Sequence, residues 1–138
     1  MKVDSIQNGI VIDHITAGRA HTICELLDID RLGVPMVIMK NAVSSKMGRK
    51  DMIKIDAPVE IDLDVIGYVD PGATVNYIKD GALSEKRSIA LPKVLTNVIH
   101  CKNPRCITTC EQELDQIFRL TDEEHKIYRC VYCETKAN

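Results

Sequence analysis

Four cysteines near the C-terminal end of the sequence constrain its fold more than any other feature. Cys101 and Cys106 enclose four residues, Cys130 and Cys133 enclose two, and 23 residues separate the two pairs. Two close thiol pairs on short polar turns can bring four sulfur atoms to one tetrahedral point, which is the geometry that Zn²⁺ favours in structural sites. A segment as short as 93–138 buries too little apolar surface to fold without a metal or disulfides. The spacing therefore predicts one structural zinc ion, with two disulfides or plain buried thiols as the alternatives.

The overall composition agrees with reduced thiols. The chain has 138 residues, of which 45% are hydrophobic and 28% are charged, values that suit one ordinary globular domain or two small ones. No apolar run approaches the roughly 20 residues that span a membrane, and the first residues lack the apolar region of a signal peptide. We therefore expect a cytoplasmic protein with no membrane partner, in which metal ligation is favoured over disulfide formation.

The charges are balanced along the chain. Residues 1–92 carry 11 Lys and Arg against 13 Asp and Glu, and residues 93–138 carry seven against seven. Modules that bind nucleic acid normally have a clear basic surplus. The balance therefore argues against a nucleic-acid partner, although a local basic cluster can still bind a smaller anion.

The first two thirds of the chain alternate between the periodicities of strands and helices. Asp80-Gly81 between two apolar runs is a strong hairpin signal. The expected strands cover 9–15, 34–39, 51–57, 73–79 and 82–89, and the expected helices cover 17–29 and 61–69. This order predicts an α+β, ferredoxin-like β-α-β-β-α-β domain with one further strand. In that plan both helices cover one face of an antiparallel sheet and leave the other face bare.

A domain boundary is expected near Pro92, which interrupts the pattern after the last of these strands. Short strands over 94–100, 114–120 and 126–131 would then surround the two cysteine pairs. We therefore divide the chain into a domain of residues 1–92 and a small all-β zinc-binding domain of residues 93–138.

A cluster of basic residues lies in the middle of the first domain: Lys46, Arg49, Lys50 and Lys54. Side chains alternate between the two faces of a strand. Ile53 and Ile55, with Asp51, should therefore face the helices, while Lys50 and Lys54 stand on the bare face. Two ammonium groups so close together repel each other unless an anion, such as a nucleotide triphosphate, lies between them. The alternative is a solvated basic surface that discourages sheet aggregation.

No complete catalytic set is present in the sequence. The four best metal ligands would all be used in a closed site, and the adjacent Asp13 and His14 are more typical of a hydrogen-bonded strand end than of catalysis. We interpret Cys24 as a small packing residue. Cys110, beside the cysteine pairs, is either an alternative ligand or a packing residue, and we favour packing. These observations favour a regulatory or structural protein over an enzyme.

Several segments together resemble the regulatory chain of aspartate carbamoyltransferase over nearly the whole sequence. They are 9–15, 47–55, 73–76, the 91–92 linker and the two cysteine pairs. The resemblance implies a non-catalytic subunit that controls pyrimidine biosynthesis. Its N-terminal allosteric domain would bind CTP, UTP and ATP, and its zinc domain would dock onto the catalytic chain. Regulatory chains of this family would also pair as a homodimer.

Positions carried over from the family assign residue roles. The implied effector-binding residues are Val3, Asp4, Ile6, Val11, Asp13, His14, Lys50, Lys54, Asn76, Ile78 and Lys86. Asn103 and Glu134 would face the catalytic chain. Two other functions stay open at this point: a zinc ribbon that binds nucleic acid, which the even charge balance disfavours, and a nucleotide-sensing subunit of another complex.

Overall fold

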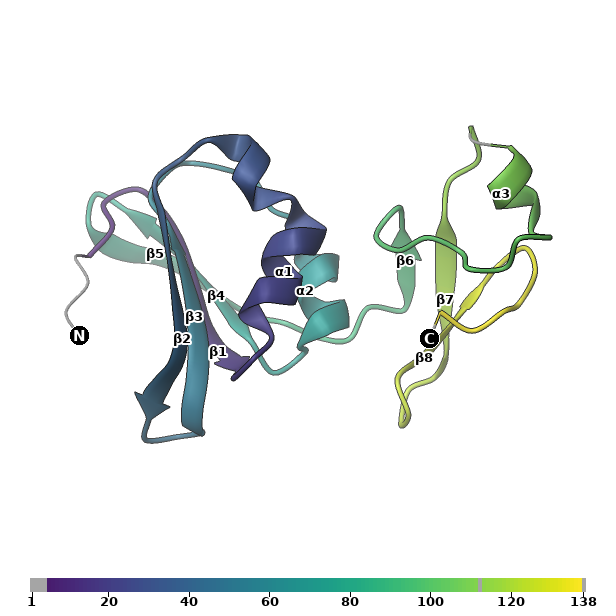
Figure 1. Ribbon diagram of the computed structural model, residues 1–138. Helices are drawn as coiled ribbons and strands as arrows, with labels where there is room; N and C mark the ends of the chain where they lie inside the picture. The colour runs from purple at the N-terminus through teal and green to yellow at the C-terminus, as the bar shows by residue number, and fades with distance from the viewer. Residues whose placement is uncertain (1–4, 112, 138) are drawn as a thin grey trace. The chain divides into compact units, whose positions relative to one another are not determined.

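The chain forms two compact units, Met1–Ala90 and Leu91–Asn138. The computed structural model describes residues 5–111 and 113–137 of it, so Val3 and Asp4 lie outside the described residues (Figure 1). None of the helices in the described ranges is long and apolar enough to cross a membrane. The first unit is α+β and the second is mainly β, as the sequence predicts.

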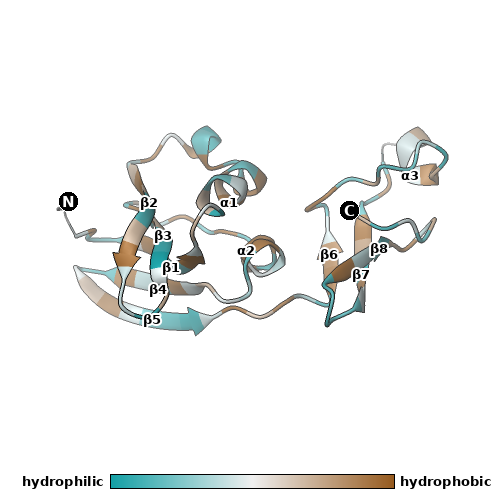
Figure 2. Ribbon diagram, turned by 60° about the horizontal axis from the view of Figure 1, so that its bottom comes forward, coloured by the Kyte–Doolittle hydropathy of each residue, from teal (hydrophilic) through white to brown (hydrophobic). Residues whose placement is uncertain are grey.

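The first unit is an antiparallel sheet of five strands with the order β2-β3-β1-β4-β5. Figures 1 and 2 show its two helices on the same face of the sheet, and no helix or strand of the described residues covers the other face. This is the predicted ferredoxin-like arrangement. The strands are β1 Gly9–Thr16, β2 Met36–Ser44, β3 Gly48–Ile55, β4 Thr74–Lys79 and β5 Ala82–Ser88. The helices are α1 Ala20–Leu27 and α2 Leu63–Val69, with the 3₁₀ helix η1 Ile29–Leu32 after α1.

Isoleucine dominates the core between sheet and helices, because the chain has no Trp and one Phe. Ile12 and Ile53 from the sheet are fully buried together with Ile23 of α1 and Ile66 of α2. The alternation predicted for β3 is confirmed: Asp51, Ile53 and Ile55 are buried, and the residues between them are not.

The ends of α1 and β2 differ from the predicted ranges for reasons of backbone geometry. Gly18 has a φ of 98°, outside the helical region, so α1 starts after it, and Asp28 with a φ of 53° ends the helix. β2 continues beyond residue 39 because Asn41, with a φ of 59°, forms a bulge after which pairing with β3 resumes.

The buried carboxylate of Asp51 is hydrogen-bonded to both the start of α1 and the bulge of β2. Asp51 has no exposed surface, and its Oδ2 atom accepts hydrogen bonds from the backbone N–H groups of Gly18 (2.9 Å) and Ala20 (3.1 Å). Its Oδ1 atom accepts one from the backbone N–H of Asn41 (2.8 Å). Asp51 on β3 therefore holds the start of α1 and the bulge of β2 at the same time.

The exchange Asp51→Ala should lower the free energy of unfolding by on the order of 3 kcal/mol, because three backbone donors lose a charged acceptor. Urea unfolding of the full chain measures the change. Glu60→Ala is the control, since Glu60 is an exposed carboxylate in the same unit. Equal stability of the two variants would show that Asp51 has no such role.

The second unit is a three-stranded antiparallel sheet with the order β6-β7-β8. It consists of β6 Val94–Thr96, β7 Ile117–Asp122 and β8 Ile127–Cys130, together with the short helix α3 Ile107–Cys110, which the sequence analysis did not predict. Leu95, Phe118 and Tyr128 are its largest buried apolar side chains. β6 is shorter than predicted because Asn97, with a φ of 57°, turns the chain.

Candidate functional site

The four predicted metal ligands converge in the second unit. The sulfur atoms of Cys101, Cys106, Cys130 and Cys133 all lie within 4.8 Å of one another. Neighbouring sulfurs are 3.5 Å apart for Cys101 and Cys133, and 3.7 Å apart for Cys106 and Cys130. These separations are far longer than a disulfide bond of about 2.05 Å, so the disulfide alternative is not what the structure shows.

The same distances fit a tetrahedral metal ion. Four ligands about 2.3 Å from a zinc ion lie about 3.8 Å from each other, close to the observed separations. The donor set contains sulfur alone, which zinc accepts and which Mg²⁺ and Ca²⁺ do not. The cluster can therefore hold one structural metal ion, consistent with zinc, and all four positions of a tetrahedron are supplied by the chain.

Short polar turns hold the sulfurs in place. In the first turn, the Asn103 carbonyl accepts hydrogen bonds from the Cys106 backbone N–H (3.1 Å) and the Thr109 hydroxyl (2.9 Å). The hydroxyl of the buried Thr108 donates to the Cys106 sulfur over 3.1 Å. In the second turn, the Glu134 backbone N–H donates to the Cys130 carbonyl over 2.8 Å. Such contacts orient the ligands before any ion arrives.

The surroundings of the thiols differ. Burial raises the pKa of the Cys101 thiol to about 12. A hydrogen bond with the Thr135 side chain lowers the pKa of the Cys133 thiol to about 6. A bound divalent cation would deprotonate both groups, because a coordinating thiol loses its proton outright.

The two other cysteines take no part in this cluster. Cys24 is half-buried against the core of the first unit, and burial raises the pKa of its thiol, in agreement with a packing role. Cys110 is exposed at the end of α3. The packing role predicted for Cys110 is therefore wrong, because its position on a four-residue helix turns its side chain outward.

On the bare face of the first sheet, strand register brings several implied effector residues into one row. Lys54 pairs with Val11, Val11 with Asn76, and Asn76 with Lys86. Directly opposite residues share a face with their Cβ atoms about 5 Å apart. Residues from β3, β1, β4 and β5 thus form a continuous line with a lysine at each end, called here the lysine row. The sequence places these residues far apart, so only the register reveals it.

Lys50, Asp13 and His14 form a second group beside the lysine row. Lys50 Nζ lies 2.9 Å from Asp13 Oδ1, and both side chains are more than four-fifths buried. Burial opposes ionisation of Asp13, but the bond from Lys50 and that from the His14 backbone N–H outweigh it, so the pKa of Asp13 is lowered. His14 stands at a bulge with a φ of 56°, and its Nδ1 atom lies 3.1 Å from Thr74 Oγ1. The expected repulsion between two unpaired lysines is thus relieved in part by Asp13.

Asn76, inside the lysine row, has an unused hydrogen-bonding atom. Its Oδ1 atom is buried, and no donor from the described part of the chain reaches it. Leaving a buried acceptor without a partner costs roughly 1–3 kcal/mol. The Asn76 Oδ1 atom is therefore an acceptor that the described part of the chain leaves unsatisfied.

The N-terminal segment lies against the tip of the β4–β5 hairpin. The Gly81 backbone N–H donates to the Gln7 carbonyl over 2.9 Å, and a Cβ added at Gly81 would meet Gln7 Oε1 at 3.0 Å. Ile6, one residue earlier, is buried. Ile78 pairs with Leu83, whose side chain is 58% exposed. Leu83 was missed by the sequence analysis, because only the hairpin register shows that it shares the bare face with Ile78.

Asn103 and Glu134, the implied partner-facing residues, belong to the two turns of the cysteine cluster. Glu134 is exposed and has a φ of 63°. Asn103 is half-buried, and its Oδ1 atom accepts from the Arg105 backbone N–H over 3.0 Å.

Comparison with known families accounts for both units. Residues 1–90 match the model described as aspartate carbamoyltransferase regulatory chain, allosteric domain, and residues 93–138 match the metal binding domain of the same chain. The chain belongs to the aspartate carbamoyltransferase regulatory chain family. The resemblance seen in the sequence is thereby confirmed, as is the prediction of a non-catalytic subunit, because this family is regulatory.

Individual members of the family are similar over almost their full length. The aspartate carbamoyltransferase regulatory chain of Clostridium botulinum (strain Hall) is 46% identical over 134 residues, which cover 97% of this chain and 92% of the relative. That of Bifidobacterium longum is 44% identical over 137 residues, 99% of each chain. That of Clostridium tetani is 42% identical over 135 residues, 97% of this chain and 94% of the relative.

Elemental analysis of the purified chain should find one zinc ion per chain. Cys106→Ser should remove the metal and unfold the second unit, because metal binding supplies folding free energy to so small a segment. Amide NMR spectra of the full chain would show loss of dispersed signals from residues 91–138 alone. Cys110→Ser is the matched control and should keep the metal. Full metal content in Cys106→Ser would contradict the assignment.

Proposed function

We propose that this chain senses CTP, UTP and ATP on the bare face of its first sheet and docks onto the catalytic chain of aspartate carbamoyltransferase through its zinc-bearing unit. Residues 1–92 form the nucleotide-binding domain and residues 93–138 the docking domain. The subunit acts in the cytoplasm as a regulator of pyrimidine biosynthesis. The observation that carries the nucleotide site is the lysine row with the unpartnered Asn76 Oδ1 atom at its centre.

The charges favour an anion at the ends of the lysine row. Lys50 is neutralised by Asp13, whereas Lys54 and Lys86 form no ion pair within the described ranges. Phosphate oxygens would take these two ammonium groups as charge-assisted donors. A bound triphosphate would also contact Lys50, whose side chain can rotate from Asp13 toward the ligand.

The other residues suit the rest of a nucleotide. Asn76 Oδ1 can accept a hydrogen bond from a ribose hydroxyl or a base amine, which satisfies its buried acceptor. Val11 gives an apolar floor between the two lysines. Ile78 and Leu83 offer apolar surface for a base near the hairpin tip. The buried Ile6 directly precedes Gln7, which is hydrogen-bonded to that tip.

Lys54→Ala and Lys86→Ala should each weaken CTP and ATP binding by about tenfold, because each removes a charged phosphate donor. Isothermal titration calorimetry of the full chain measures the affinities. Lys79→Ala is the control, since Lys79 is an exposed lysine at the end of β4. Unchanged affinity in both variants would contradict the site.

The pair of Lys50 and Asp13 gives a sharper version of this experiment. Lys50→Ala leaves the Asp13 carboxylate uncovered near the phosphates, so it should weaken binding more than either single exchange above. Adding Asp13→Asn should restore part of the affinity. A double-mutant cycle over these two residues isolates the coupling, and additive effects would show that Asp13 does not meet the phosphates.

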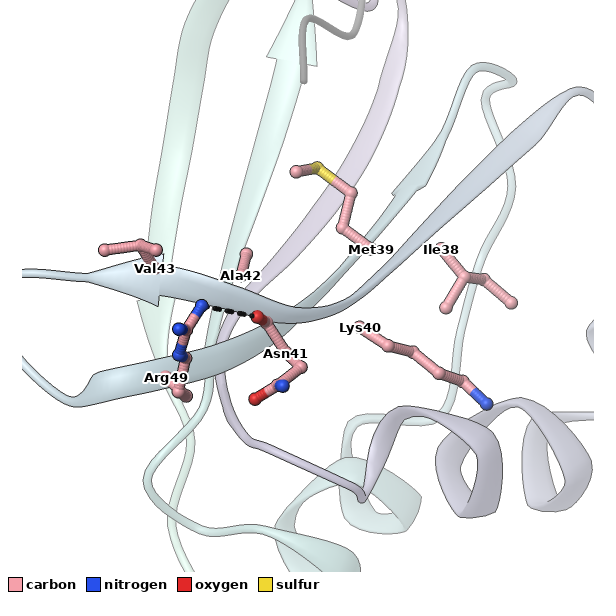
Figure 3. A pocket seen from close by; sticks show the side chains of 7 residues that line it. All are labelled: Ile38, Met39, Lys40, Asn41, Ala42, Val43 and Arg49. Atoms are coloured by element: carbon pink, nitrogen blue, oxygen red, sulfur yellow. Dashed lines mark hydrogen bonds between the residues drawn. The ribbon is translucent and has the colours of Figure 1, made fainter.

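The edge of the first sheet supports the proposed regulatory-chain homodimer. β2 is an edge strand with unpaired backbone groups, and Val37, Ile38 and Val43 on it are exposed. Figure 3 shows Ile38 and Val43 among the residues of β2 that line a pocket together with Arg49. The pocket has a volume of about 480 Å³, and Arg49 Nη1 donates to the Asn41 carbonyl over 3.3 Å. A long apolar edge favours pairing with another strand, and a second copy offers the same edge.

Control of a partner requires that the effector bind one state of the assembly more tightly than the other, because equal affinity for both states shifts nothing. The sheet edge and the docking domain are the two surfaces through which such a difference can pass. The proposed function therefore needs both nucleotide binding and assembly.

Removal of zinc from the full chain by a chelator should abolish co-purification with the catalytic chain and leave CTP binding within about twofold, because the ligands lie only in the docking unit. Gel filtration and calorimetry measure the two effects separately. Re-addition of zinc should restore the complex. A stable complex formed by the metal-free chain would contradict the assignment of docking to residues 93–138.

A further inference from the structure

The outer face of the second sheet carries a row of cations. Arg119 on β7 pairs with Arg129 on β8, and Arg129 pairs with Lys136, which lies on the returning chain after the second cysteine turn. Directly opposite residues point to the same face of a sheet, whereas Phe118 and Tyr128, their neighbours in sequence, are buried on the other face. Three positive charges thus lie side by side, called here the outer cation row.

The backbone holds these charges close together. Cys130 N–H donates to the Thr135 carbonyl over 3.0 Å, and Ala137 N–H donates to the Tyr128 carbonyl over 2.9 Å. The pair of Arg129 and Lys136 lies between these two bonds and is therefore a non-hydrogen-bonded pair, the type with the shorter Cα separation. Like charges directly opposite each other oppose the pairing of the strands.

No carboxylate in the described part of the chain compensates this repulsion. Throughout residues 5–111 and 113–137, no Asp or Glu oxygen lies within 4.0 Å of the three cations. Arg129 Nη1 donates to the Glu134 carbonyl over 3.0 Å. The side chains of Arg119 and Lys136 are exposed and form no ion pair or hydrogen bond with the described residues. Both guanidinium groups stay charged at any physiological pH.

Apolar residues flank the row on the same face. Val94 pairs with Arg119 and is 47% exposed. Ile117 is two residues before Arg119, and its carbonyl accepts a hydrogen bond from the backbone N–H of Val131, which is 39% exposed. Arginine beside exposed apolar side chains is typical of the buried centre of protein–protein interfaces.

We propose that the outer cation row is a docking surface for an acidic protein face, and that it forms part of the contact with the catalytic chain. This inference rests on the proposed function. Carboxylates of the partner would bind the two arginines through paired N–H groups, while Val94 and Val131 meet apolar surface around them.

A protein partner fits the surface better than nucleic acid. The three charges span two strand spacings, about 10 Å, and do not extend along a groove. Residues 93–138 carry seven basic and seven acidic residues, so the unit lacks the surplus that draws a polyanion from a distance. The apolar neighbours would also be left without a partner on a phosphate backbone.

The double variant Arg119→Glu/Lys136→Glu of the zinc-loaded full chain tests the proposal, because both side chains are exposed and neither forms an ion pair or hydrogen bond within the described ranges. Its Kd for the catalytic chain should rise about tenfold or more at low salt. The salt dependence seen for the parent chain should also weaken. Lys126→Glu, in the β7–β8 turn of the same unit, is the control and should bind like the parent. Zinc content and thermal unfolding of every variant verify that the unit is folded.

The outcomes distinguish a failure of the docking surface from a failure of the proposed function. If the double variant binds the catalytic chain as the parent does, with the same salt dependence, the docking surface is overturned and the proposed function stands. If the parent chain itself does not bind the catalytic chain, both the docking surface and the proposed function are wrong. If the parent binds a DNA duplex and the double variant loses that affinity while keeping the catalytic chain, the row is a nucleic-acid surface and the proposal is wrong.

Discussion

Two short helices can cover only one face of a five-stranded sheet, and the proposed function of the first unit depends on that limit. The helices bury Ile12, Ile53 and their neighbours on one side. The same alternation of strand residues sends Val11, Lys54 and Asn76 to the side that no helix protects. The stable core and the proposed binding surface are therefore two consequences of one pattern, and they lie on opposite faces of a single sheet.

The second unit solves a different problem of stability. Its sheet has three short strands, and few large side chains are fully buried within it. A metal ion bound by the four convergent sulfur atoms would supply the folding free energy that a larger apolar core would otherwise supply. Because the ligand turns also carry Asn103 and Glu134, the shape of the surface around them follows from the geometry of the metal site.

Much of this could be predicted from the sequence, since it depends on local spacing. The cysteine pairs predicted the cluster, and the alternation over β3 predicted that Ile53 and Ile55 are buried. The pairing of Lys50 with Asp13 could not be predicted, because it depends on how β1 and β3 meet around the bulge at His14. The outer cation row was hidden for the same reason: Arg119 and Lys136 are brought together only by the register of separate strands. The four-residue helix α3 is too short to show a helical period.

Asp51 has a mechanical consequence for β3. This strand presents Lys50 and Lys54 to the bare face. Its Asp51 side chain accepts hydrogen bonds from the start of α1 and from the bulge of β2. The strand therefore cannot slide by itself. A shift of β3 would have to move the start of α1 and the bulge of β2 with it, or break the hydrogen bonds that Asp51 accepts from both.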